Sequence, residues 1–73
     1  MHTDTLEKII AKWPEGTVLC LYHRNGFSTI VADRDRIELD RHAVVGTDAT
    51  GVSFAVPLEE IVYAVVRADR KHK

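Results

Sequence analysis

The residues of this 73-residue chain that are best suited to chemistry are five consecutive ones, Tyr22-His23-Arg24-Asn25-Gly26. Arginine presents a rigid fork of donors to a phosphate or carboxylate, and tyrosine or histidine rings stack on unpaired bases. The Asn-Gly pair favours a two-residue hairpin turn, where neighbouring side chains stay exposed. The segment predicts RNA contact through residues 22–25; the alternative is a polar hairpin tip with the tyrosine half-buried.

The C-terminal residues 67–73 are basic. They carry four positive charges and one negative, whereas the rest of the chain carries six positive and ten negative. A basic end on an acidic body favours contact with phosphates, and we assign Arg67, Arg70 and Lys71 to RNA binding. The alternative is a solubilising end that frays in water.

Other side chains give little indication of catalysis. The sequence has no glycine-rich phosphate loop and no paired cysteines, and the single Cys20 lies in an apolar run that predicts a buried residue. His23, His42 and Asp40 match no known metal-ligand spacing, and the adjacent Glu59 and Glu60 are expected to diverge into solvent. We therefore expect no catalytic residue, no metal, no cofactor and no enzymatic activity.

The first element that positions these residues is a helix over residues 4–13. Leu6, Ile9, Ile10 and Trp13 fall at i, i+3, i+4 and i+7, one apolar stripe of a helical period. Pro14 disfavours helical backbone at the residue before it. The stripe is expected to pack against a sheet.

Strands follow the helix. Residues 18–22 and 27–32 are expected to pair across the Asn-Gly turn, with Tyr22 opposite Thr29. A turn or bulge at 33–35 precedes a short strand at about 36–41, and a further strand is expected at 43–47.

The C-terminal quarter indicates the architecture. Residues 51–56 and 61–66 are strand-like and are joined at Pro57, which cannot donate to a sheet ladder. A strand, a corner and a second strand are typical of small sheets that curl into barrels. We expect one α+β domain over residues 1–73, with an N-terminal helix packed on a bent four- or five-stranded antiparallel sheet that approaches an SH3-like or Sm-like barrel.

The last strand suggests a second function. Residues 61–66 are apolar on both faces and carry no charge, whereas exposed edges are usually blunted by lysine, proline or a bulge. Ile61, Tyr63 and Val65 are therefore expected at an interface with another chain, which makes a protein-interaction or homo-oligomerisation module the alternative to a non-catalytic RNA-binding module.

Composition restricts the class of protein. Hydrophobic residues make up 45% and charged residues 29%, as in a globular domain. No apolar run is long enough to span a bilayer, and residues 1–4 lack the pattern of a signal peptide, so we expect a cytoplasmic protein without membrane contact.

Short motifs over most of the chain resemble the RNA cyclic-group end-recognition domain. They are the helix ending in tryptophan (6–13), the Tyr-x-Arg-x-Gly strand end (22–26) and the aromatic-x-Val-Pro-Leu-x-x-Ile segment (54–61). The family carries His-Arg where this chain has Glu59-Glu60. The resemblance implies an RNA-end ligand, with a terminal phosphate near Tyr22, His23 and Arg24.

A weaker resemblance is to Sm-like and Hfq-like barrels. It rests on the N-terminal helix, the Asn-Gly hairpin and the spacing of Val56, Ile61 and Val65. It implies a small barrel that forms rings by pairing edge strands and binds RNA in the ring.

Overall fold

The computed structural model describes residues 1–68. The chain begins with one helix, α1 (Thr3–Ala11), and continues with six strands and two short 3-10 turns. These are β1 (Thr17–His23), β2 (Ser28–Val31), η1 (Arg34–Arg36), β3 (Ile37–Leu39), β4 (Ala43–Thr47), β5 (Ser53–Pro57), η2 (Leu58–Glu60) and β6 (Ile61–Ala68).

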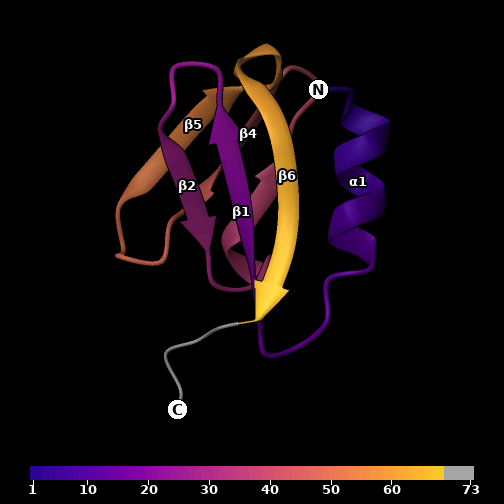
Figure 1. Ribbon diagram of the computed structural model, residues 1–73, viewed down its shortest axis with the longest axis vertical. Helices are drawn as coiled ribbons and strands as arrows, with labels where there is room; N and C mark the ends of the chain where they lie inside the picture. Colours follow the sequence, from indigo (N-terminus) through magenta and orange to yellow (C-terminus); the bar gives the residue numbers. More distant parts are fainter. Residues whose placement is uncertain (69–73) are drawn as a thin grey trace.

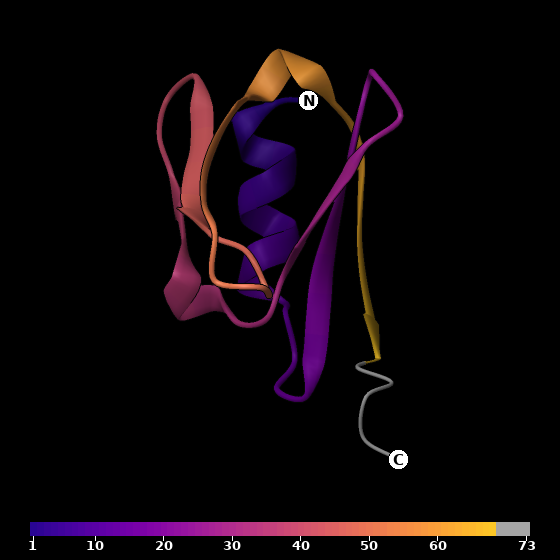
Figure 2. The ribbon, with the colours of Figure 1, turned by 90° about the vertical axis from the view of Figure 1, so that its left-hand side faces the viewer.

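The strands form two antiparallel sheets of three strands each. The first sheet has the order β2-β1-β6 and the second has the order β3-β4-β5. The two sheets face each other, and α1 lies along one open side between them (Figures 1 and 2). The expected α+β class with an N-terminal helix is confirmed. The single sheet of four or five strands is wrong, and the described strands do not close into one barrel.

The break between the sheets has a local cause in the Asp33–Arg36 segment. The Asp33 carboxylate accepts the Asp35 N–H at 3.0 Å and caps η1. A capped 3-10 turn interrupts the extended backbone. The chain therefore leaves the first sheet after β2 and begins the second sheet with β3.

The core lies between the two sheets and α1. Trp13 is 5% exposed, as the helical stripe predicted, and its ring N–H donates to the Thr17 carbonyl oxygen at 3.0 Å. The helix ends at Ala11, two residues earlier than expected, because Pro14 disfavours a helical Trp13. The fully or nearly fully buried core residues are Leu6, Trp13, Leu19, Leu21, Val31, Val44, Val56, Leu58 and Ile61.

The first hairpin forms where expected, but its register differs by one residue. Tyr22 pairs with Ser28 rather than with Thr29. The His23 N–H donates to the Phe27 carbonyl at 2.9 Å, so the loop has three residues, 24–26, of which only Gly26 has positive φ. Because Asn25 keeps a negative φ, the two-residue turn that we expected is replaced by the three-residue type with a glycine bulge.

The corner at Pro57 forms as predicted and connects the two sheets. β5 belongs to the second sheet and β6 to the first, with η2 between them (Figure 2). Two hydrogen bonds hold this corner: the Leu58 N–H donates to the His42 carbonyl at 2.9 Å, and the Arg24 N–H donates to the Glu60 carbonyl at 2.7 Å. The corner is thereby fixed to both sheets.

Candidate ligand-binding face

The first sheet has one face on the core and one face toward the outside. Leu19 and Leu21 of β1 are completely buried on the core face. Because side chains alternate along a strand, residues 18, 20 and 22 lie on the opposite face. Residues that pair directly share a face, so the register defines the outer face, which consists of Val18, Cys20, Tyr22, Ser28, Ile30, Tyr63, Val65 and Arg67.

Two tyrosines pair across strands on this outer face. Tyr22 of β1 lies opposite Tyr63 of β6, with ring centroids 5.4 Å apart and ring planes tilted by 33°. The pairing shifts between Tyr22 and His23, a bulge that places Val62 and Tyr63 on the surface, each 56% exposed. The Tyr63 ring is thus open to a ligand, and Tyr22 supports it from one side.

An arginine on the same face completes the arrangement. The Arg67 guanidinium donates to the Tyr22 hydroxyl oxygen at 2.9 Å. Along β1 and β6, the Cys20–Val65 pair lies between the Val18–Arg67 pair and the Tyr22–Tyr63 pair. The hydrogen bond from Arg67 to Tyr22 therefore passes over Cys20, which is 3% exposed. A guanidinium has five N–H donors, so Arg67 retains donors for an anion while it orients Tyr22.

The outer face carries charge of one sign. Arg67 is the sole charged residue of the eight outer-face residues, and the others are apolar, aromatic or small polar residues. A planar aromatic group can stack on the Tyr63 ring while an anionic group meets the guanidinium. The face therefore offers two contacts that a nucleotide needs.

The structure separates the predicted RNA-binding residues of the hairpin. The His23 ring lies on the other face of the sheet, where its Nε2 and the Thr29 hydroxyl are 2.8 Å apart. The Arg24 guanidinium donates to the Glu59 carbonyl at 3.0 Å, and the Asn25 side-chain oxygen accepts the Phe27 N–H at 3.0 Å. These three residues make contacts within the protein, although Arg24 and Asn25 stay exposed.

Of the remaining predicted residues, Arg67 lies beside Tyr22, while Arg70 and Lys71 fall outside the described residues. Ile61, assigned to an interface, is 1% exposed and belongs to the core. Tyr63 and Val65, assigned to the same interface, are on the outer face. Sequence reasoning did not place Tyr63 beside Tyr22, because the pairing of β1 with β6 joins segments about forty residues apart.

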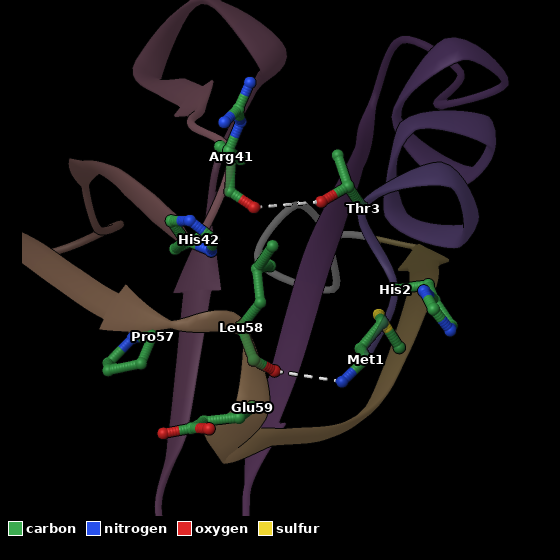
Figure 3. A pocket seen from close by; sticks show the side chains of 8 residues that line it. All are labelled: Met1, His2, Thr3, Arg41, His42, Pro57, Leu58 and Glu59. Carbon is green, nitrogen blue, oxygen red and sulfur yellow. Dashed lines mark hydrogen bonds between the residues drawn. The ribbon is translucent and has the colours of Figure 1, made fainter.

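Apart from the outer face, the surface has a hollow beside η2, between the start of α1 and the β3–β4 turn (Figure 3). The Thr3 hydroxyl donates to the Arg41 carbonyl at 3.2 Å, and the amino group of Met1 donates to the Leu58 carbonyl at 3.0 Å. The Arg41 guanidinium points away from Met1 and Leu58 (Figure 3). The polar side chains of this hollow do not converge on one point, so it is a weaker site than the outer face.

Residues 1–68 contain neither a cluster of metal ligands nor a membrane-spanning helix. No three histidine, cysteine or acidic side chains in this part of the chain gather as metal ligands would. No helix in it has the length and apolar character needed to cross a bilayer.

Comparison with known proteins adds no relative: no family model, no curated protein and no solved structure matches the chain.

Proposed function

We propose that the protein is a non-catalytic RNA-binding module that binds single-stranded RNA on the outer face of its first sheet. The observation that carries the proposal is the Tyr63–Tyr22–Arg67 arrangement, in which an exposed ring is backed by a second ring and joined to a guanidinium. Unpaired bases stack on aromatic side chains, and arginine binds the phosphates between them.

The size of the outer face indicates a weak, short-footprint interaction. Stacking contributes about 1–3 kcal/mol per base, and this face offers one exposed tyrosine and one partly covered tyrosine. Further affinity has to come from phosphate contacts. The sequence of residues 67–73 carries four positive charges, those of Arg70 and Lys71 among them, and Arg24 lies at the hairpin end of β1.

The finer fold and ligand assignments belong to the same proposal. We regard the two sheets as an open form of an SH3-like or Sm-like barrel. Two connections between the sheets support this: the corner between β5 and β6, and the hydrogen bond from the Ala49 N–H to the Ile30 carbonyl at 2.7 Å. The motif resemblance to the RNA end-recognition domain favours an RNA end as the ligand, with Arg24 near its terminal phosphate.

Fluorescence anisotropy with a labelled single-stranded RNA octamer tests this function. We expect binding at low ionic strength that weakens as salt rises, because phosphate contacts release counterions. Tyr63→Ala should lose about 1–3 kcal/mol of binding free energy, and Arg67→Ala should lower the slope of log K against log salt by about 0.7. Octamers with a 3′-phosphate and a 3′-hydroxyl distinguish end recognition from binding along the strand.

The matched control is Val52→Ala, an exposed apolar residue in the β4–β5 turn and outside the outer face. It should bind as the unmodified protein does. Absence of binding at low salt, or equal losses for Val52→Ala and Tyr63→Ala, would remove the RNA proposal.

A second candidate is a protein-interaction or homo-oligomerisation module that uses β6. It is favoured by one specific observation: β6 is an edge strand of the first sheet as far as residue 68, and Val62 and Tyr63 on it are more than half exposed. Edge strands of this kind pair with another chain. Light scattering at micromolar concentration tests it: an oligomer that Val65→Lys converts to a folded monomer supports the candidate, and a monomeric mass without added partner removes self-association.

A further inference from the structure

The outer edge of β6 presents backbone groups that no strand within residues 1–68 uses. The His23 N–H donates to the Phe27 carbonyl, just before β2, whereas the Arg24 N–H donates to the Glu60 carbonyl, just before β6. The backbone N–H and C=O groups of successive residues in an antiparallel strand point alternately to its two neighbouring strands. Those of the even-numbered residues of β1 therefore point to β6. Their partners Tyr63 and Val65 therefore bond to β1, and the N–H and C=O groups of Ala64 and Val66 point to the outer edge.

A shallow groove runs along this edge, between β6 and α1. Figure 1 shows α1 running alongside β6, and the two elements are in contact. Ile9, Ala64, Val65 and Val66 form the apolar part of the groove, and Lys8 and Lys12 form its charged part. The groove thus combines unused strand backbone, an apolar floor and two cations.

The two lysines are available to an anionic partner. Both are exposed, and the ion pair found in the described part of the chain, between Arg36 and Asp33, involves neither of them. Within residues 1–68, no carboxylate lies within ion-pair distance of these two lysines, and a partner segment with negative charge would supply one.

The spacing of the lysines matches an added strand. Residues four apart on a helix are separated by about 6 Å along the axis. Residues two apart on a strand are separated by about 6.6 Å and lie on the same face. Acidic side chains at alternate positions of a strand beside β6 therefore line up with Lys8 and Lys12. Glutamate suits the site better than aspartate, because its longer aliphatic stem covers Ile9 while its carboxylate reaches the ammonium groups.

We propose that the groove between α1 and β6 binds an extended peptide segment of another protein with glutamate at alternate positions, which adds to β6 as a fourth strand of the first sheet. This inference rests on the second candidate function, pairing at the β6 edge, and names the partner's chemistry. Backbone hydrogen bonds to Ala64 and Val66 supply affinity, and the Glu–Lys pairs supply selectivity and register. Basic segments are excluded because they would bring like charges together.

The experiment is fluorescence anisotropy of the full chain with three labelled octapeptides. The first alternates glutamate and threonine, the second has the same composition with the glutamates contiguous, and the third has glutamine in place of glutamate. We expect the alternating peptide to bind at least tenfold more tightly than the other two. Lys8→Glu combined with Lys12→Glu should reduce its binding at least tenfold, whereas Arg41→Glu, which reverses one charge outside the groove, should leave it within twofold.

A backbone variant separates strand addition from simple charge attraction. Ala64→Pro removes an edge N–H that points away from β1, a position where a strand tolerates proline. It should abolish binding of the alternating peptide, and circular dichroism should show that the chain remains folded. If this variant does not fold, protection of the Ala64 and Val66 amides from hydrogen exchange on peptide binding gives the same answer.

The outcomes distinguish this inference from the function on which it rests. Equal binding of the glutamate and glutamine peptides would overturn the acidic partner but keep the β6 edge as a binding site. Self-association by light scattering together with no peptide binding would assign the edge to a second copy and overturn the peptide. A monomer that binds none of the peptides would overturn both.

Discussion

Replacing Trp13 with alanine should destabilise the protein more than any other single truncation of α1 or the turn after it. The ring is 5% exposed in the core between the helix and the two sheets, and its N–H donates to the Thr17 carbonyl. Removing a large buried aromatic side chain costs about 3–5 kcal/mol. A core in a chain this short supplies roughly 3–5 kcal/mol of net stability. We therefore expect Trp13→Ala to be largely unfolded at room temperature.

A second variant separates the two roles of this side chain. Trp13→Phe keeps most of the buried ring and loses the hydrogen bond to Thr17, whose net contribution is about 0.5–1.5 kcal/mol. It should remain folded with a lower midpoint. Urea denaturation followed by far-ultraviolet circular dichroism suits both variants, because Trp13 is the sole tryptophan and its fluorescence is lost with it. A loss below about 1 kcal/mol for Trp13→Ala would refute the packing of the helix over the core.

Three further predictions concern other parts of the fold. A Cβ on Gly46 would overlap the Arg36 backbone, so Gly46→Ala should destabilise by about 2 kcal/mol or more in urea denaturation; a neutral effect would contradict the close approach of β3 and β4. Hydrogen bonds to Asp48, first from the Thr50 hydroxyl and then from the Val52 N–H, hold the pKa of its carboxyl below the ordinary value of 3.8. The stabilisation is complete above that value and lost as the pH falls through the folded pKa, so acid titration of Asp48→Asn should be flatter below about pH 4 than that of the unmodified protein. The Cys20 thiol lies under the Tyr22–Arg67 bond and should react with a thiol reagent only slowly in the native state and faster in Arg67→Ala; fast labelling of the unmodified protein would contradict the outer-face geometry.

Local signals in the sequence predicted local structure well. The apolar stripe that includes Leu6 and Trp13 predicted a packed helix, and Pro57 predicted the corner between the last two strands. Both features depend on backbone constraints and periodicity within one segment. They are readable without knowledge of any distant contact.

The hairpin register shows where local reasoning failed. The Asn25-Gly26 pair predicts a two-residue turn, but Asn25 keeps negative φ and its side-chain oxygen accepts the Phe27 N–H. The three-residue loop moves the opposing strand by one position, which changes the pairing of Tyr22 from Thr29 to Ser28. An Asn-Gly pair is compatible with both loops, and the packing of Leu21 and Val31 into the core selects between them.

The candidate site was predictable only in part. Tyr22 and Arg67 were identified from residue type and charge, but the third member, Tyr63, was assigned to an interface. The three residues come together because β6 pairs with β1, a long-range contact that no local pattern encodes. His23 was expected beside Tyr22, but side chains alternate along a strand and place it on the opposite face.

A titration of the isotope-labelled protein with single-stranded RNA, followed by amide chemical shifts, tests whether the outer face of the first sheet binds RNA. We predict that shifts concentrate on the outer face of the first sheet, at Tyr22, Tyr63, Val65 and Arg67, and that Tyr63→Ala removes them without changing the rest of the spectrum. The β3–β4–β5 sheet should be unaffected. Shifts confined to that second sheet, or no shifts at low ionic strength, would contradict the assignment of the outer face as the binding surface.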